Sequence, residues 1–309
     1  MRVFVTGIAG QLGHDVMAEL SKRGHRAIGS DIRIPSSLPP VTEPLSGSTP
    51  DPSYVQLDIT NEQAVKAVIS EWKPDAVIHC AAWTAVDAAE DEENCGTVDR
   101  INHLGTQYLA EAAKAVDAKM IYISTDYVFD GRGTRPWAPD DRNYSPLNVY
   151  GATKLAGEKA VSQALHKYFI VRIAWVFGLN GKNFIKTMLK IGETHPQVRV
   201  VNDQIGTPTY TLDLARLLVD MVETEKYGYY HATNDEGGQY ISWYDFAKEI
   251  FRQAGMTTEV LPVTTAEYGL SKAKRPFNSR LDKSKLTEAG FQPLPDWKDA
   301  LSRYLKELG

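Results

Sequence analysis

Two residues able to move a proton, Tyr150 and Lys154, stand four positions apart in the run YGATK. On a helix that spacing puts both side chains on one face. A free tyrosine has a pKa of about 10 and is a weak acid–base catalyst at neutral pH. A neighbouring ammonium group, with the positive charge of an oxidised nicotinamide, favours the phenolate and is expected to lower that pKa. The pair fits proton transfer during carbonyl reduction, although most such pairs are surface features.

A hydroxyl group that would join this pair ends an apolar segment. The predicted strand Ile121–Thr125 closes with Ser124 and Thr125, at the strand end where α/β folds place catalytic groups. Thr125 is expected to hydrogen-bond the carbonyl oxygen that receives the proton. Ser124 is equally well explained as satisfying the strand end.

Three glycines, Gly7, Gly10 and Gly13, follow a short predicted strand and open a predicted helix. Gly7 permits a tight turn, Gly10 lets the backbone approach a pyrophosphate, and Gly13 allows close packing of helix on sheet. The free N–H groups and positive dipole end of the helix favour phosphate. This context predicts a dinucleotide site rather than an ordinary glycine-rich turn.

The residues expected on the adenosine side favour different cofactors, some NADH and some NADPH. Asp31 closes the second predicted strand, where a carboxylate would bind the ribose and repel a 2′-phosphate. Arg33 would instead attract that phosphate, so NADPH and NADH both stay open as cofactors. Asp58 and Ile59 are placed to reach the adenine, but Asp58 is equally well explained as a helix cap ahead of Asn61.

The elements that carry these residues alternate between short apolar runs and amphipathic segments. The predicted strands are Val3–Thr6, Ala27–Ser30, Tyr54–Leu57, Ala76–Cys80, Met120–Ser124 and Phe169–Ile173. The predicted helices between them are Gln11–Arg23, Asn61–Trp72, Arg100–Val116 and Tyr150–Ser162. Apolar strands separated by helices indicate an α/β fold with a doubly wound parallel sheet of the Rossmann type.

A second, smaller α/β substrate domain is expected after Trp175, where the pattern becomes mixed. Helices are predicted at Asn183–Glu193, Leu212–Glu223, Trp243–Gln253 and Asp296–Leu308. The expected division is a dinucleotide-binding domain at 1–175, with a segment near 211–233 returning to it, and a mainly substrate-binding domain at 176–309. The proline- and serine-rich segment Ile34–Ser53 is expected to be a surface loop.

Composition narrows the class of protein and its surroundings. The 309 residues are 43% hydrophobic and carry a net charge of −5 without a long basic stripe, which argues against nucleic acid as the main partner. There is neither a signal-peptide pattern nor an apolar stretch long enough for a membrane span, so a cytoplasmic protein is expected. The two cysteines cannot build a disulfide framework, and the scattered histidines support no metal site.

Several ordered runs resemble the extended short-chain dehydrogenase/reductase family and, within it, the dTDP-4-dehydrorhamnose reductase family. These runs are Gly10–Gly13, Cys80–Asp87, Ser124–Gly131, Pro146–Gly151, Asn183–Met188 and Asp203–Thr209. The resemblance departs from the family pattern at Cys80, where asparagine is expected, and at Trp83, where tyrosine is usual.

The resemblance implies a two-domain fold with a nucleotide sugar in the cleft, and a homodimer stays open. It implies Thr125, Tyr150 and Lys154 as the catalytic set. Residues implied to line the cofactor, besides the glycines, Tyr150 and Lys154, are Gln11, Leu12, Asp31, Asp58, Ile59, Ala81, Ala82 and Trp83. Residues implied to face the substrate, besides Thr125, are Val86, Asp126 and Trp175.

The implied reaction is reduction of dTDP-4-dehydro-L-rhamnose to dTDP-L-rhamnose with NAD(P)H, the last step of dTDP-L-rhamnose biosynthesis. Hydride goes to C4 of the sugar and a proton comes from Tyr150. A sugar-nucleotide dehydratase or epimerase is a second hypothesis, but a dehydratase would need an Asp-Glu pair after Thr125, where Asp126 and Tyr127 stand. A non-catalytic nucleotide-binding regulatory subunit is the third.

Overall fold

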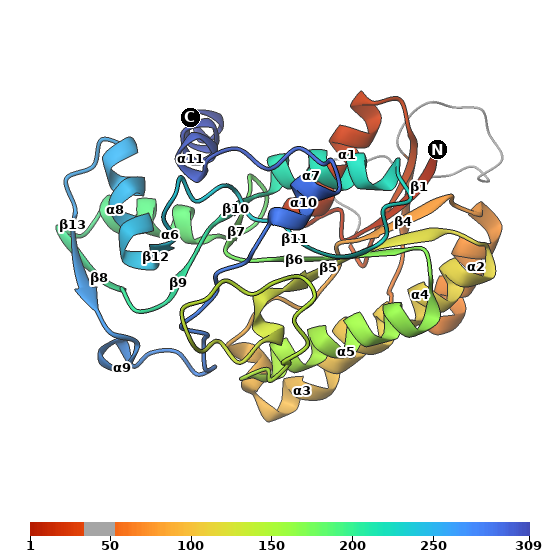
Figure 1. The fold of residues 1–309 in the computed structure, drawn as a ribbon, viewed down its shortest axis with the longest axis horizontal. Helices are drawn as coiled ribbons and strands as arrows, with labels where there is room; N and C mark the ends of the chain where they lie inside the picture. The colour runs from red at the N-terminus through yellow and green to blue at the C-terminus, as the bar shows by residue number, and fades with distance from the viewer. Residues whose placement is uncertain (34–52) are drawn as a thin grey trace.

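The central feature of the computed structural model, which describes residues 1–33 and 53–309, is a seven-stranded parallel sheet (Figure 1). Its strand order is β11-β6-β5-β4-β1-β2-β3. The strands are β1 (Arg2–Thr6), β2 (Arg26–Asp31), β3 (Ser53–Gln56), β4 (Ala76–His79), β5 (Lys119–Thr125), β6 (Tyr168–Ile173) and β11 (Gly228–His231). Strand order reverses between β1 and β4, so their carboxyl ends open the crevice in which such sheets bind ligands.

Helices cover both faces of this sheet, which confirms the doubly wound α/β fold. On one face α1 (Gln11–Lys22) packs against α7 (Thr211–Val222). On the other lie α2 (Glu62–Trp72), α4 (Gly105–Ala115) and α5 (Val149–Ala164). Because both faces are covered, the strands read as continuous apolar runs, as in Ala76, Val77 and Ile78 of β4.

The prediction of one regular helix over Arg100–Val116 is wrong at its N-terminal end. The chain forms α3 (Glu92–Asp99), then a π-helical turn, η2 (Arg100–Leu104), and only then α4. Two 3-10 turns, η1 (Ala88–Glu90) and η3 (Asp126–Val128), flank the same region. The apolar periodicity of the sequence could not show the extra residue that widens η2.

Most of the remaining elements form a second lobe with its own core. They are β7 (Val176–Phe177), α6 (Phe184–Gly192), β8 (Gln197–Val201), β9 (Ile205–Gly206), β10 (Thr209–Tyr210), β12 (Ile241–Ser242), α8 (Trp243–Gln253), β13 (Glu259–Val263), α9 (Thr265–Tyr268) and α11 (Trp297–Leu308). The short helix α10 (Ser284–Glu288) instead packs on β11, and its Leu286 belongs to the core of the main sheet. Phe177, Tyr210, Phe246, Trp297 and Tyr304 pack at the centre of this core. Figure 1 shows α6, α8 and α11 grouped beside one end of the main sheet.

Three further observations bear on the sequence expectations. In sequence, α7 and β11 interrupt the elements of the second lobe, but β11 is the edge strand of the main sheet and α7 packs against α1. The predicted loop Ile34–Ser53 lies outside the described residues, except for Ser53, which opens β3. Among the helices of the described part, none is long and apolar enough to cross a membrane.

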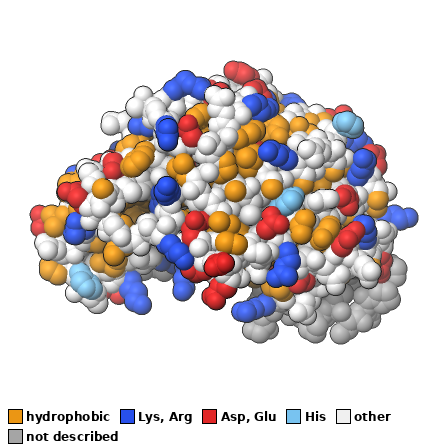
Figure 2. Space-filling view, turned by 90° about the horizontal axis from the view of Figure 1, so that it is seen from below, with side chains coloured by type: hydrophobic (Ala, Val, Ile, Leu, Met, Phe, Trp, Pro, Cys, Tyr) orange, Lys and Arg blue, Asp and Glu red, His pale blue; other side chains and the backbone are white. Residues whose placement is uncertain are grey.

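Basic and acidic side chains alternate over the face of the molecule seen in Figure 2. No broad area of one charge stands out on that face, and hydrophobic side chains lie between the charged ones. A nucleic-acid partner would be expected to meet a continuous basic surface.

Candidate active site

The glycine loop connects β1 to α1 and leaves no room for side chains. Gly7 has a φ of +75°, and a Cβ on it would lie 2.6 Å from the backbone nitrogen of Ala81. A Cβ on Gly13 would lie 2.2 Å from the carbonyl oxygen of Gly7. Both approaches are far closer than real Cβ contacts, so the loop folds in this way only with glycine at these positions.

The start of α1 is suited to a phosphate group. Gly10 occupies the N-cap without a side-chain cap, and the first turn carries no acidic residue. Its N–H groups therefore face outward beside a positive dipole end. Together with the glycine cradle, this geometry fits the pyrophosphate of a dinucleotide.

The first two residues of α1 differ in their surroundings. Leu12 is buried in the core beneath the sheet. Gln11 is half-buried, and its Oε1 accepts a hydrogen bond from Nδ2 of Asn183 at 3.1 Å. Gln11 therefore links the glycine loop to the N-cap of α6 in the second lobe.

Asp31, at the end of β2, holds the same loop. Its Oδ2 accepts a hydrogen bond from the backbone N–H of Ala9 at 3.0 Å, and its Oδ1 accepts one from Arg33 at 3.3 Å. The side chain of Arg33 is exposed. Both residues thus lie near the loop, and their opposite preferences for a 2′-phosphate remain a prediction.

On the predicted adenine side, the capping explanation for Asp58 is wrong. Asn61 caps α2 by accepting from Ala64 at 3.1 Å. Asp58 is exposed and binds the backbone and hydroxyl of Thr60 at 2.9 and 2.7 Å. Ile59 is buried and would lie 3.0 Å from a Cβ on Gly105, so it is mainly a packing residue.

The segment Ala81–Trp83 continues from β4 beside the glycine loop and is half-buried. Asn102, in the π-helical turn η2, accepts from the backbone N–H of Trp83 at 2.8 Å and donates to its carbonyl at 3.2 Å. Its amide also donates to Thr153 on α5, at 3.2 Å. Sequence reasoning missed Asn102, which fixes this segment relative to α5.

Burial shifts the pKa values of two further groups next to this segment, His79 and Cys80. His79, at the end of β4, lies between the hydroxyls of Thr6 and Thr106, and burial lowers its pKa to about 3. Cys80 is a free thiol whose pKa burial raises to about 12. Both groups are therefore neutral at pH 7.

Thr125, Tyr150 and Lys154 meet where β5 ends and α5 begins. Asn148 caps α5 by accepting from Gly151 at 2.8 Å, so Tyr150 and Lys154 lie in its first two turns. Thr125 and Lys154 are buried and Tyr150 is half-buried. The Lys154 ammonium donates to the carbonyl of Ile123 at 2.7 Å and lies 4.1 Å from the ring centre of Tyr122.

The charge states of this pair differ from the sequence expectation. Burial raises the pKa of Tyr150 above its ordinary value, opposed only in part by a hydrogen bond with Thr125. Burial lowers the pKa of Lys154 to about 7, while the carboxylate of Glu158 opposes that fall. The expected lowering of the Tyr150 pKa is therefore wrong for the protein groups by themselves, because desolvation is the largest cause of the shift and the Lys154 ammonium donates to the carbonyl of Ile123 instead.

Asp126 is a buried carboxyl group beside Thr125. Its Oδ1 accepts from the Thr125 hydroxyl at 3.0 Å, whereas Oδ2 has no hydrogen-bond partner among the described residues. Burial raises its pKa to about 6, although the nearby hydroxyls of Ser279 and Thr125 lower that pKa by a smaller amount. A buried oxygen without a partner is suited to receive a hydroxyl group from a ligand.

Trp175 lies at the junction of the lobes in a left-handed conformation, with a φ of 52°. Its ring stacks on Trp243 with centroids 4.0 Å apart, and its edge would lie 3.1 Å from a Cβ on Gly206. Non-glycine residues rarely adopt this φ, and such strain tends to occur at ligand sites. Trp175 also packs against the core clusters on both sides of this junction, and its role toward the substrate remains a prediction.

A segment of the second lobe, 271–275, lies across the first lobe near Val86. Asp87 accepts from the guanidinium of Arg275 at 2.5 Å and from the backbone of Ala273 at 3.0 Å. Arg275 also donates to the hydroxyl of Tyr127 at 3.2 Å, and the Tyr127 ring meets that of Tyr150 edge-on at 5.6 Å. We call residues 271–275 the strap.

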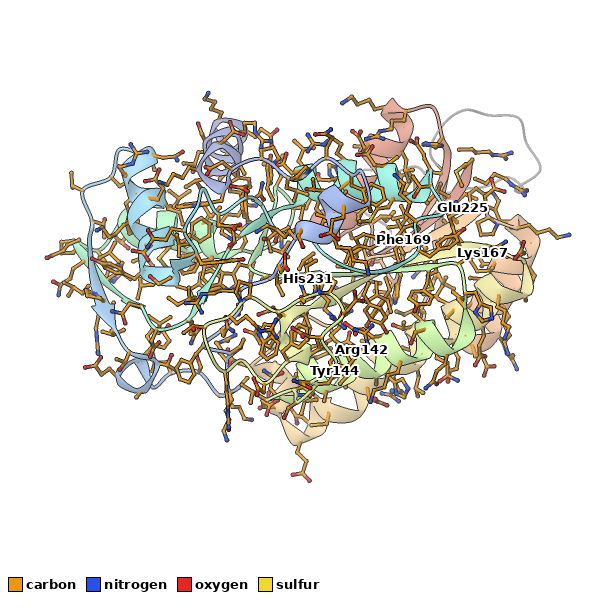
Figure 3. The ribbon with its side chains drawn as sticks, viewed as in Figure 1. Arg142, Tyr144, Lys167, Phe169, Glu225 and His231 are labelled. Atoms are coloured by element: carbon orange, nitrogen blue, oxygen red, sulfur yellow. The ribbon has the colours of Figure 1, made fainter. Side chains whose placement is uncertain are left out.

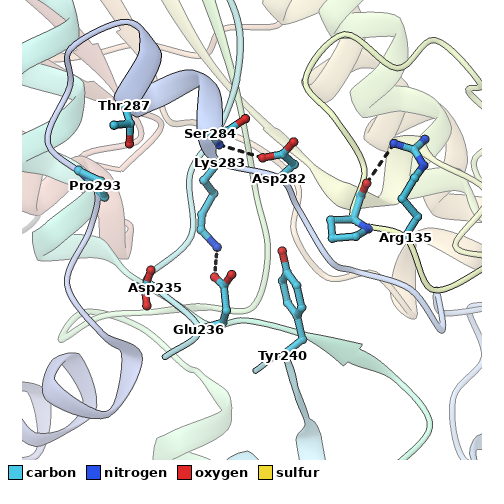
Figure 4. A pocket seen from close by; sticks show the side chains of 10 residues that line it. Arg135, Asp235, Glu236, Tyr240, Asp282, Lys283, Ser284, Thr287 and Pro293 are labelled. Atoms are coloured by element: carbon cyan, nitrogen blue, oxygen red, sulfur yellow. Dashed lines mark hydrogen bonds and ion pairs between the residues drawn. The ribbon is translucent and has the colours of Figure 1, made fainter. Parts of the chain in front are cut away.

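A separate cavity of about 440 Å³ lies between α10 and the segment that contains Arg135 (Figure 4). Lys283 and Glu236 form an ion pair inside it, and Tyr240 donates to a backbone carbonyl. None of the predicted catalytic residues lines this cavity. Within residues 1–33 and 53–309, no three histidine, cysteine, aspartate or glutamate side chains gather as a metal site would require.

Known proteins resemble this chain over its whole length. The sequence profile of the family described as "RmlD substrate binding domain" matches residues 1–309. A dTDP-4-dehydrorhamnose reductase of Streptomyces griseus is 38% identical over 315 residues, covering 99% of this chain and 94% of the relative.

Two solved structures are also similar to this chain in fold and in sequence. The dTDP-4-dehydrorhamnose reductase from Clostridium acetobutylicum has a TM-score of 0.88 at 40% identity, covering 100% of this chain and 99% of that one. The dTDP-4-dehydrorhamnose reductase from Bacillus anthracis, in complex with NADP, has a TM-score of 0.87 at 38% identity, covering 99% of each chain. The chain therefore belongs to the RmlD substrate binding domain family, the family of the dTDP-4-dehydrorhamnose reductases.

Proposed function

We propose that this chain reduces dTDP-4-dehydro-L-rhamnose to dTDP-L-rhamnose, the last step of dTDP-L-rhamnose biosynthesis, with NADPH or NADH. The observation that carries the proposal is the meeting of Thr125, Tyr150 and Lys154 beside the glycine loop, in a chain similar over its full length to such reductases. When bound, the nicotinamide supplies the hydride that reaches C4 of the sugar.

Tyr150 acts as the proton donor to the sugar O4. Because burial holds its pKa above the ordinary value, the phenol carries its proton at neutral pH before the reaction begins. The hydroxyl of Thr125, which donates to Asp126 in this structure, turns its proton to the same oxygen when the sugar binds and stabilises the charge that develops there. Lys154 binds the nicotinamide ribose, and its ammonium favours the phenolate that the donation leaves behind.

The residues that bind the dinucleotide and the sugar nucleotide lie around this catalytic set. Gly7, Gly10 and Gly13, with the N-terminus of α1, hold the pyrophosphate, and Gln11, Leu12 and Ala81–Trp83 line its surroundings. Asp31, Arg33 and Asp58 form the adenosine side, and Ile59 packs behind them. Val86, Asp126 and Trp175 face the sugar nucleotide, with the free Oδ2 of Asp126 accepting a substrate hydroxyl.

The two lobes divide this work. The segment 1–175, together with 211–233, binds the dinucleotide, and most of 176–309 binds the sugar nucleotide. We place the chain in the cytoplasm, where nucleotide sugars are made, and expect no nucleic-acid or membrane partner. A homodimer is compatible with this arrangement.

The test is oxidation of NADPH and of NADH, measured separately at 340 nm, with enzymatically made dTDP-4-dehydro-L-rhamnose. Consumption of either nucleotide and formation of dTDP-L-rhamnose support the proposal. Absence of both reactions would overturn it. Purified protein that retains bound NAD through turnover would favour a dehydratase or epimerase instead.

A further inference from the structure

A buried carboxylate lies one helical turn after Lys154. Glu158 is on α5 and is 1% exposed. Its Oε1 accepts hydrogen bonds from the Ser124 hydroxyl at 2.6 Å and from Nε of Arg172 at 2.8 Å, while Oε2 accepts from Nη2 of Arg172 at 2.8 Å. Arg172 is fully buried as well.

These contacts join three elements at the level of the catalytic groups. Ser124 and Arg172 are register partners on β5 and β6, and Ser124 directly precedes Thr125. Lys154 binds the carbonyl of Ile123, the residue before Ser124. Two consecutive residues of β5 are therefore attached to α5, one through Lys154 and one through Glu158.

The far side of Arg172 is also occupied. It donates to the hydroxyl of Tyr144 at 2.8 Å and to the carbonyl of Pro139 at 3.2 Å, and it lies 3.3 Å from His231. In Figure 3, Tyr144 lies beside α5, and His231 is the last residue of β11. Since a buried ion pair is weak evidence for stability in itself, such a fully bonded pair calls for another explanation.

We propose that Glu158 is a positioning residue for the reduction, which holds Thr125 at the end of β5 in place through Ser124 and sets a negative charge one helical turn from Lys154. This inference rests on the proposed function for its kinetic part. Its electrostatic part concerns the chain alone and can be measured without turnover.

The charge balance around Lys154 supports the second half of the proposal. Burial lowers the pKa of Lys154 to about 7, and the Glu158 carboxylate acts against that fall. The titratable groups that face Lys154 or Glu158 are His79 and Cys80 from the end of β4, Tyr122 from β5, Arg172 from β6 and Tyr229 from β11. Since His79 and Cys80 are neutral at pH 7, Glu158 is the negative charge in this group.

The test compares Glu158→Gln with a matched variant, Asp213→Asn. Asp213 is likewise a buried carboxylate bonded to both ends of an arginine, Arg303, at 3.0 and 2.7 Å. It lies on α7, which packs against α1 rather than α5. Loss of a buried charge is thus common to both variants, whereas the hydrogen bond with Ser124 and the electrostatic effect on Lys154 belong to Glu158 alone.

We expect Glu158→Gln to lower kcat by about 10- to 100-fold with little change in cofactor binding. The alkaline limb of its pH–rate profile should move to lower pH, because Lys154 loses its proton more readily. Asp213→Asn should leave that limb in place. Equal kinetic changes in both variants would overturn the positioning role, and a wild-type chain that reduces no substrate would instead overturn the proposed function.

The titration of Lys154 itself is followed by NMR of the full chain with ¹³C-labelled lysine, its signal assigned through Lys154→Arg. Its midpoint should fall in Glu158→Gln and stay unchanged in Asp213→Asn, and an unchanged midpoint in both would overturn the electrostatic role. Should Glu158→Gln not fold, Ser124→Ala removes only the hydroxyl contact. That variant should lower kcat without moving the alkaline limb, and an unaltered kcat would refute the positioning role.

Discussion

Replacing Asp126 by asparagine should stabilise the fold in a pH-dependent way. Burial raises the pKa of this carboxyl from 3.8 to about 6, so the folded chain binds its proton more tightly than the unfolded chain does. Stability of the wild type therefore falls as pH rises from about 4 to about 6, since the folded state must then ionise a buried group. The shift corresponds to about 3 kcal/mol of lost unfolding free energy above that window.

Asparagine keeps the shape and an oxygen to accept from Thr125 but cannot ionise. In urea unfolding, the gain of Asp126→Asn over wild type should therefore be small at pH 4 and reach about 2–3 kcal/mol at pH 7.5. Asp117→Asn serves as the control, because that carboxylate is 84% exposed beside Lys167 and its exchange should change stability by less than about 1 kcal/mol. A gain for Asp126→Asn that is equal at both pH values would refute the reasoning.

Three further changes follow from the site. Gly13→Ala pushes a Cβ against the Gly7 carbonyl, so it should lower the unfolding free energy by about 1–3 kcal/mol and weaken NADPH binding, measured by fluorescence titration. The control Gly96→Ala, on an open stretch of α3, should raise the unfolding free energy by about 1 kcal/mol. Equal effects of the two variants would contradict the clash argument. Tyr150→Phe should abolish NADPH oxidation while NADPH still binds, so retained turnover would refute its role as donor. Asp87→Asn releases the strap and should raise KM for the sugar nucleotide several-fold without changing NADPH affinity; an unchanged KM would show that the strap does not shape the substrate site.

Much of the dinucleotide half could be predicted because local sequence decides it. The glycine spacing leaves one backbone geometry for the turn from β1 to α1, and the apolar runs of β1, β2, β4, β5 and β6 match a sheet covered on both faces. The family resemblance drawn from the ordered runs is confirmed by the full-length match. The NADP-bound relative supports the expectation of a nicotinamide cofactor.

Long-range partners could not be predicted. Asp87 and Arg275 are 188 residues apart, and no periodic pattern connects the strap to the β4 end. Asn102 acts through a π-helical turn that looks like ordinary helix in the sequence. The spacing of Lys154 and Glu158 alone did not indicate that the Glu158 carboxylate pairs with Arg172 and also holds Ser124.

The reversed shift of Tyr150 changes how the chemistry should be understood. A tyrosine with a lowered pKa would suit proton removal from an alcohol, whereas one with a raised pKa begins the reaction with its proton in place, as reduction of a ketone requires. Donation from such a phenol is favourable only if positive charge stabilises the resulting phenolate. The pKa of Lys154 is only about 7 even though the Glu158 carboxylate opposes the effect of burial, so the charge of Lys154 is the quantity that the surrounding residues must sustain. Glu158 is the carboxylate placed to sustain it.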